Sequence, residues 1–152
     1  ASEAETVIVV LGARAEACRA ALDDRPVKII VNNRWAKGQS TSMQAGLSAL
    51  PKNISAAVFP LADQPFITAE VIDALIARYR RALAPVVWPE FDGKRGNPVL
   101  FDRRLFPEMR RVTGDTGARP VLLAHQAKAE RVPVSDAGVL KDVDTPEDLE
   151  GA

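Results

Sequence analysis

Short apolar runs alternate with helix-forming stretches along most of the chain. The β-branched run 6–11 is followed by an alanine-rich stretch, 13–22, of helical composition. A second apolar run, 27–31, ends in two asparagines, which favour turns. Thr41 and Gln44 then have the spacing of a capping box, which predicts a helix that starts at Thr41. Strands that alternate with helices at this spacing predict a mostly parallel, right-handed α/β sheet.

The apolar run 56–61 has the length and continuity of a strand that is buried on both faces. Pro65 blocks continuation of the strand, and Thr68 is a suitable N-cap for a helix over 69–83. In open parallel sheets, ligands bind beyond the carboxyl ends of the strands, so Asp63 is predicted to face a site. The alternative is that Asp63 only caps a turn through its own backbone.

The second half of the chain continues the pattern with shorter elements. Apolar residues of the helix 69–83 fall on one stripe, and the arginines near its C-terminus are interpreted as a solvated face. The remaining predicted elements are strands at 86–88 and 98–101 around a turn at 92–93, a helix at 122–128, a strand at 131–134 and a helix starting at 145–146. The chain has no internal repeat or linker, so we expect one domain.

Composition narrows the class of protein. The 152 residues are 47% hydrophobic and 26% charged, as in an ordinary soluble domain. Basic and acidic residues both number 20, which favours neither nucleic acid nor an anionic membrane as a partner. No apolar run approaches the roughly 20 residues of a membrane span, and the acidic start is unlike a signal peptide. The single cysteine, Cys18, is predicted to be a small buried hydrophobe, and a cytoplasmic location is expected.

Two polar regions have the residue types of ligand-binding loops. The stretch 38–42 precedes a helix and offers backbone N–H groups and hydroxyls to an anion or nucleotide, with simple capping as the favoured alternative. The stretches 93–98 and 114–119 combine glycines, which let backbone approach a ligand, with the phosphate-neutralising cations Lys94, Arg95 and Arg119. Two ordinary tight turns are the alternative for these stretches.

A third polar region is acidic and lies near the C-terminus. Asp142 and Asp144 alternate, so in an extended segment they point the same way, and either can join Asp63 around a hard cation. Mg²⁺ takes one or two carboxylates together with phosphate oxygens of a substrate, which suits carboxylates in two distant loops. Zinc and a Ser-His-Asp arrangement fit poorly, because His125 is the one histidine and is interpreted as a surface or satisfied core residue.

Four segments together resemble the molybdenum cofactor nucleotidyltransferase family, most closely the CTP:molybdopterin cytidylyltransferases. Leu61-Ala62-Asp63-Gln64-Pro65 resembles the family's metal-binding Asp motif, and the stretch 142–149 resembles its C-terminal acidic motif. The stretches 96–101 and 114–119 are similar to the segments that border the pterin. The resemblance runs nearly end to end, and the four motifs occur in the family's order.

The resemblance implies a Rossmann-like nucleotide-diphospho-sugar transferase fold of the GT-A-like kind, a three-layer sandwich with a mostly parallel sheet. The family opens with a strand and a glycine-rich loop of the form Leu-Ala-Ala-Gly-x-Ser-x-Arg-Met-Gly-x-x-Lys, and nothing here matches it. The fold is therefore expected to lack its first βα unit, and 1–152 is expected to be a single, N-terminally incomplete nucleotidyltransferase domain.

The resemblance also implies roles for individual residues. Asp63 and Asp144 would hold Mg²⁺ on the nucleotide phosphates, with Asp142 as the substitute for Asp144. Leu61 and Ala62 belong to the same binding motif. Further implied contacts are those of Gly38, Ser40 and Ser42 with the base and ribose, and those of Asn97, Asp115 and Arg119 with the pterin.

The implied reaction is transfer of CMP from CTP to the terminal phosphate of molybdopterin, with release of pyrophosphate. Transfer of this type needs mainly positioning and charge stabilisation, so no covalent nucleophile is required. Two alternatives stay open: a guanylyl- or other nucleotidyltransferase, because base choice rests partly on the unmatched loop, and a non-catalytic module that serves molybdoenzyme maturation. The implied partners are CTP or another NTP, a molybdopterin-type substrate, and a molybdoenzyme or its chaperone.

Overall fold

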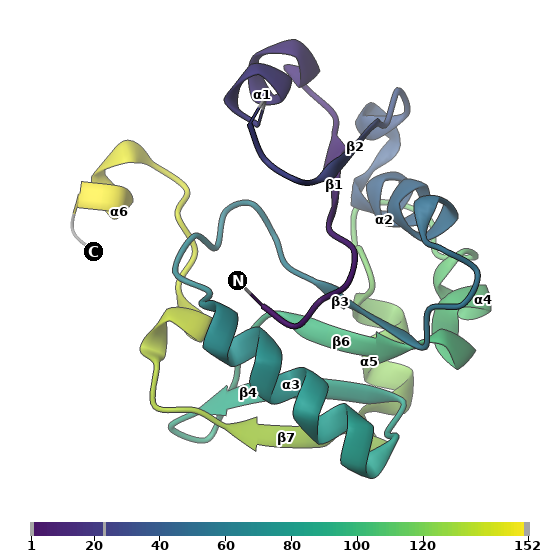
Figure 1. Ribbon diagram of the computed structural model, residues 1–152, viewed down its shortest axis with the longest axis vertical. Helices are drawn as coiled ribbons and strands as arrows, with labels where there is room; N and C mark the ends of the chain where they lie inside the picture. The colour runs from purple at the N-terminus through teal and green to yellow at the C-terminus, as the bar shows by residue number, and fades with distance from the viewer. Residues whose placement is uncertain (1, 23, 151–152) are drawn as a thin grey trace. The chain divides into compact units, whose positions relative to one another are not determined.

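A computed structural model describes residues 2–22 and 24–150, and its ribbon is drawn in Figure 1. The chain divides into two units, and each is described by itself. The five-stranded unit comprises the described parts of 1–3, 56–102 and 126–152. The two-stranded unit comprises the described parts of 4–55 and 103–125.

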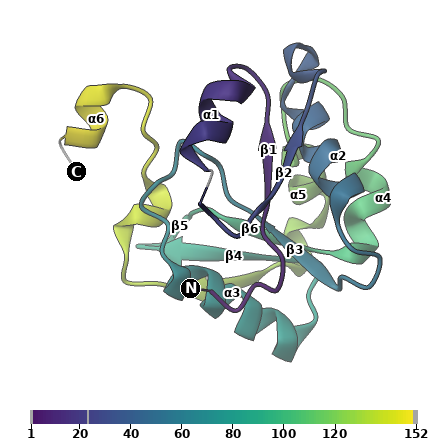
Figure 2. The ribbon, with the colours of Figure 1, turned by 45° about the horizontal axis from the view of Figure 1, so that its top comes forward.

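The two-stranded unit is built on a parallel strand pair. Strands β1 (Ile8–Leu11) and β2 (Lys28–Val31) pair in register, and Figure 2 shows them side by side. Helix α1 (Ala15–Ala21) lies between them in sequence, and α2 (Gln39–Ala49) packs against β1. This confirms the predicted strand–helix–strand–helix order. The unit also holds η1 (Trp35–Lys37), η2 (Arg103–Leu105), α4 (Phe106–Met109) and α5 (Arg119–His125).

The five-stranded unit is a mixed sheet of order β3-β6-β4-β5, with β7 paired to β4. Helix α3 (Ala69–Ala82) contacts β4 and β7 and lies across the sheet (Figure 1). The strands are β3 (Ala56–Phe59), β4 (Val86–Phe91), β5 (Lys94–Arg95), β6 (Val99–Asp102) and β7 (Glu130–Pro133). The other elements are η3 (Gln126–Lys128), η4 (Ala137–Leu140) and α6 (Pro146–Glu150).

Strand directions are more mixed than the predicted, mostly parallel sheet. In the described residues β1–β2 and β4–β7 are parallel, whereas β6 runs antiparallel to β3 and β4, and β4–β5 is an antiparallel hairpin. Asp92 and Gly93 form the hairpin turn with φ of 52° and 75°, the left-handed conformations of a primed turn. The short connections after β4 enforce antiparallel pairing, because a parallel crossover needs about a dozen residues or more.

The core of the five-stranded unit confirms the apolar stripe predicted for α3. Leu75 and Tyr79 are buried against Val87, Leu100 and Val132 of the sheet. The Tyr79 hydroxyl also donates a hydrogen bond to the buried carboxylate of Asp102 in β6. Thr68 caps the helix as predicted, because its hydroxyl accepts from the Val71 N–H at 3.3 Å. Strand β3, by contrast, is only partly buried in the described residues, so the prediction of burial on both faces is wrong.

The predicted start of α2 at Thr41 is also wrong. The N-cap is Gly38, and Thr41 lies inside the first turn, where its hydroxyl bonds to the main-chain oxygen of Gly38 at 2.7 Å. The Gln44 amide reaches away from the helix start and donates to the main-chain oxygen of Val112 at 2.7 Å. A capping-box spacing is therefore present in the sequence without a capping box in the fold.

Three further predictions concern single side chains. Cys18 is exposed rather than buried, because the short helix α1 buries none of its residues. The arginines of α3 are not simply solvated: Arg78 pairs with Glu130 at 3.1 Å, and Arg80 pairs with Glu3 at 3.0 Å. His125 is partly exposed, and its Nε2 lies 3.0 Å from the carboxylate of Glu108, as expected for a surface residue.

None of the helices in the described ranges has the length and apolarity that crossing a bilayer requires.

Candidate functional site

The two acidic segments singled out in the sequence lie side by side in the five-stranded unit. The Val143 N–H donates to the main-chain oxygen of Asp63 at 2.6 Å. The Gln64 side-chain amide donates to Asp142 Oδ1 at 2.7 Å, across a separation of 78 residues. Main chain and side chains therefore join the segment after β3 to the segment before α6, as the proposed metal site requires.

The carboxylates on these segments are open to solvent. Asp63, Asp142 and Asp144 are all exposed. Within residues 2–22 and 24–150, no three acidic, histidine or cysteine side chains gather as a complete metal cage. The available donors are one carboxylate on the first segment, Asp63, and two on the second, Asp142 and Asp144, which leaves coordination positions for oxygens of a substrate.

Packing of the segment 138–143 explains why it lies against the loop of Asp63. The Lys141 ammonium lies 5.7 Å from the centre of the Phe66 ring. Gly138 approaches the same loop so closely that an added Cβ would lie 2.7 Å from the main-chain oxygen of Phe66. The Asn97 N–H donates to the main-chain oxygen of Val139 at 2.9 Å, which brings the predicted residue Asn97 to the same segment.

Leu61 and Ala62 are exposed in the loop that carries Asp63. The Gln64 N–H donates to the main-chain oxygen of Leu61 at 3.1 Å, which forms a tight turn. Asp63 therefore lies within a turn that main-chain atoms close, and that turn lies against the second acidic segment. Leu61 and Ala62 remain predicted binding residues.

The start of α6 fixes the backbone around Asp144. Asp148 Oδ2 accepts the N–H groups of Asp144 and Thr145, both at 3.0 Å, and the Thr145 hydroxyl accepts the N–H of Asp148 at 3.3 Å. Pro146 occupies the first helical position, so the predicted helix start is confirmed. The cap holds the main chain of Asp144 and leaves its exposed carboxylate available.

Asp148 gives a prediction for acid pH. Hydrogen bonds from the N–H groups of Asp144 and then Thr145 lower the pKa of Asp148 below its usual 3.8. Because the folded pKa is lowered, the cap is fully present above pH 3.8 and is lost as the pH falls through the folded pKa. We expect the carboxyl carbon of Asp148 to titrate, by NMR, with a midpoint below 3.8, and Asp148→Asn to abolish the acid transition of the Thr145 amide resonance. A midpoint at or above 3.8 would contradict this cap.

In the two-stranded unit, the residues before and within α2 use their polar groups in the fold. The Gln39 N–H donates to Asp115 Oδ1 at 2.8 Å, and the Ser40 N–H donates to the main-chain oxygen of Gly114 at 3.2 Å. The Ser40 hydroxyl donates to the same Gly114 oxygen at 2.7 Å. Capping, which the sequence favoured, therefore accounts for these donors, and anion binding by the same N–H groups is not supported. The proposed base and ribose contacts of Gly38, Ser40 and Ser42 stay predictions.

Asp115 and Arg119 belong to this same junction. Asp115 caps α2 from a loop distant in the sequence, and Arg119 begins α5 with its N–H donating to the main-chain oxygen of Thr116 at 3.3 Å. Sequence reasoning missed Asn32, whose buried amide donates to the hydroxyls of Thr41 and Ser42 at 2.8 and 2.9 Å. Asn32 directly follows β2, and this position at the carboxyl end of a strand was the sequence feature that could have marked it as a structurally important polar residue. Pterin contacts of Asp115 and Arg119 stay predictions.

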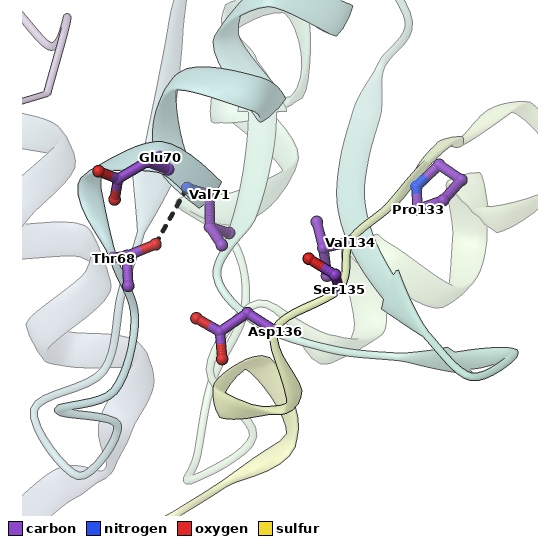
Figure 3. Close-up of a pocket in the computed structure, with 7 residues that line it drawn as sticks. All are labelled: Thr68, Glu70, Val71, Pro133, Val134, Ser135 and Asp136. Atoms are coloured by element: carbon purple, nitrogen blue, oxygen red, sulfur yellow. Dashed lines mark hydrogen bonds between the residues drawn. The ribbon is translucent and has the colours of Figure 1, made fainter.

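A hollow beside the start of α3 was not predicted. It has a volume of about 410 Å³ and is lined by Thr68, Glu70, Val71, Pro133, Val134, Ser135 and Asp136 (Figure 3). Thr68 is occupied by its N-cap bond to Val71, drawn as a dashed line in Figure 3. Asp136 Oδ1 accepts the Gly138 N–H at 2.8 Å. The Thr68 hydroxyl and the Asp136 carboxylate therefore already accept hydrogen bonds from main-chain N–H groups of the fold.

Comparison with known proteins settles the family. Residues 1–129 match the model of the MobA-like NTP transferase domain. The chain belongs to this family. A protein named nicotine blue oxidoreductase, from Paenarthrobacter nicotinovorans, is 30% identical over 149 residues, which is 94% of this chain and 72% of that protein. The purine catabolism protein PucB of Bacillus subtilis is 35% identical over 118 residues, or 75% of this chain and 55% of PucB.

Solved structures confirm the fold class of this NTP transferase domain. A homologue of Rv0371c from Mycobacterium sp. strain JC1 superposes with a TM-score of 0.83 at 28% identity, over 99% of this chain and 74% of that one. A nucleotidyl transferase from Methanothermobacter thermautotroptrophicus superposes with a TM-score of 0.79 at 18% identity, over 98% of this chain and 72% of that one. The domain thus has the Rossmann-like nucleotide-sugar transferase fold that the sequence motifs predicted.

Proposed function

We propose that this domain is a Mg²⁺-dependent cytidylyltransferase that transfers CMP from CTP to the terminal phosphate of a molybdopterin-type cofactor. The observation that carries the proposal is the hydrogen bond between Val143 and Asp63, which joins two acidic segments in a domain of the NTP transferase family. The choice of CTP and molybdopterin rests on the resemblance of the four sequence motifs to the cytidylyltransferases.

The residues fit a hard divalent cation bound together with a nucleotide. Mg²⁺ prefers oxygen ligands and keeps several positions for water and phosphate, so two carboxylates are enough. Asp63, with Asp142 or Asp144, supplies such a pair on exposed and mutually bonded segments. When bound there, the cation would neutralise charge that develops on the phosphates.

The chain's own residues then have to hold two anionic substrates in line. A phosphate oxygen of the acceptor forms a bond to the α-phosphorus of CTP, while the bond from that phosphorus to the bridging oxygen breaks and its electron pair leaves with pyrophosphate. Such a reaction depends on positioning and charge stabilisation, and no side chain has to become covalently modified. Lys141, next to Asp142 and held over Phe66, contributes a positive charge on the same segment.

One observation favours a second candidate, an oxidoreductase. The relative that matches 94% of this chain carries that name. An oxidoreductase would transfer electrons between two substrates and would release no pyrophosphate. The two candidates therefore give different products in one assay.

The test is pyrophosphate release by the protein with Mg²⁺, molybdopterin and either CTP or GTP, with oxidation of a reduced nicotinamide followed in parallel. We expect pyrophosphate to be released with CTP, and we expect this release to require both Mg²⁺ and molybdopterin. Release with GTP alone would identify a guanylyltransferase, and nicotinamide oxidation without release would favour the oxidoreductase. Calorimetric binding of CTP without turnover would favour a non-catalytic module for molybdoenzyme maturation.

A further inference from the structure

Gln64 has a side chain whose placement the fold alone does not explain. It is 6% exposed, although its neighbours Asp63 and Pro65 are exposed. Its Nε2 donates to Asp142 Oδ1 at 2.7 Å, and its Oε1 is buried without a hydrogen-bond partner among the described residues. Buried polar atoms are nearly always paired in native proteins, and leaving this oxygen unpaired costs stability, so the stability of the fold does not explain the placement of the side chain.

The orientation of the amide follows from the chemistry of its partner. An ionised carboxylate only accepts hydrogen bonds, so the NH₂ group of Gln64 must face Asp142. The carbonyl oxygen then points away from Asp142 and stays unpaired. Turning the amide over would place two oxygens against each other and would lose the bond to Asp142.

The turn itself does not depend on this side chain. Main-chain bonds hold it, because the Gln64 N–H donates to the Leu61 oxygen at 3.1 Å and the Asp63 oxygen accepts from Val143 at 2.6 Å. What the side chain adds is a fixed position for the carboxylate of Asp142. The hydrogen bonds at Asp144, in the described residues, involve its main-chain N–H instead.

We propose that Gln64 is a positioning residue, which holds the Asp142 carboxylate for the divalent cation through the hydrogen bond from its Nε2. This inference rests on the proposed function, and it makes Asp142 rather than Asp144 the ordered partner of Asp63. Groups that orient a metal ligand in this way commonly change metal affinity 10- to 100-fold when they are removed, which sets the size of the expected effect at roughly that range.

The test uses Mn²⁺ alone as the probe, with its dissociation constant measured by water-proton relaxation. Gln64→Met keeps the length of the side chain and removes both amide groups, and we expect it to weaken Mn²⁺ binding by about 10- to 100-fold. Asp142→Asn should weaken binding at least as much, and Gln64→Met should have no further effect in the Asp142→Asn background. The matched control is Gln44→Met, which likewise removes hydrogen bonds of a glutamine amide, here to main-chain oxygens, and should leave Mn²⁺ binding unchanged.

Thermal unfolding separates positioning from a structural role. A structural role alone would lower the melting temperature of Gln64→Met and leave its Mn²⁺ affinity within twofold of the wild type, which would overturn the proposal. Additive effects of Gln64→Met and Asp142→Asn, or a wild-type protein that takes up no Mn²⁺, would overturn it as well.

Failure of this inference is distinguishable from failure of the proposed function. If Mn²⁺ binding follows the expected pattern but no pyrophosphate is released with CTP, the positioning role stands and the transfer reaction is wrong. If pyrophosphate is released while Gln64→Met binds Mn²⁺ as the wild type does, the reaction stands and the positioning role is wrong.

Discussion

Replacing Asp63 with asparagine is expected to lower kcat/KM for pyrophosphate release from CTP by at least about 100-fold. The reason is that a bound metal ion stabilises the charge that develops on the phosphates in the transition state by several kcal/mol. Asparagine keeps the shape of the side chain and removes the negative charge that the cation requires. The exposed position of Asp63 means that folding should be little affected, so circular dichroism and thermal unfolding should match the wild type. Pyrophosphate release at saturating Mg²⁺ is the measurement.

The matched control for this substitution is Asp92→Asn. Asp92 is an exposed aspartate in the same unit, at the β4–β5 turn, with φ of 52°. Asparagine adopts this left-handed conformation readily, so the turn should persist. Activity of Asp92→Asn should stay within about twofold of the wild type, as is usual for surface changes away from a site. Wild-type activity in Asp63→Asn would rule out the metal role of Asp63.

The second large effect is expected for stability, from Gly38→Ala. Gly38 has φ of 120°, and an added Cβ would overlap the main-chain oxygen of Gly114. Backbone on both sides of this contact is held by the hydrogen bonds of Gln39 and Ser40 to the 114–115 turn, so neither side moves freely. We expect a loss of about 3 kcal/mol or more in the free energy of unfolding, measured in urea.

The Gly114→Ala variant separates the cost of backbone strain from the cost of the steric clash expected in Gly38→Ala. Gly114 lies at the same junction with φ of 84°, but an added Cβ would meet nothing within 4 Å. Only the cost of a left-handed conformation remains, which is about 1–2 kcal/mol for a residue with a side chain. Equal losses for Gly38→Ala and Gly114→Ala would contradict the close approach of the two turns.

Local sequence signals predicted the elements that depend on neighbouring residues. The start of α3 followed from Thr68, which accepts from the Val71 N–H, and the buried side of α3 followed from the spacing of Leu75 and Tyr79. The start of α6 followed in the same way from Thr145 and Pro146. Caps and amphipathic stripes are properties of a single turn or helix, and a single sequence contains them.

Features that depend on distant residues were missed or misjudged. Asp115 caps α2 from a loop more than seventy positions away, so the local spacing of Thr41 and Gln44 predicted the wrong helix start. The bond between Gln64 and Asp142 likewise joins segments 78 residues apart, and no periodicity signals it. Motif resemblance brought Asp63 and the second acidic segment together correctly, because it carries information about the whole fold.

The central claim is that the segments of Asp63 and Asp142 bind one divalent cation with a nucleotide. Paramagnetic broadening by Mn²⁺ in the presence of CTP tests it most directly, through the backbone amide resonances of the protein. We predict that the resonances of Asp63, Gln64 and Val143 broaden together at substoichiometric Mn²⁺ and recover when Mg²⁺ is added in excess. Broadening centred instead on the hollow near Glu70 and Asp136, with the Asp63 and Val143 resonances unchanged, would contradict the account.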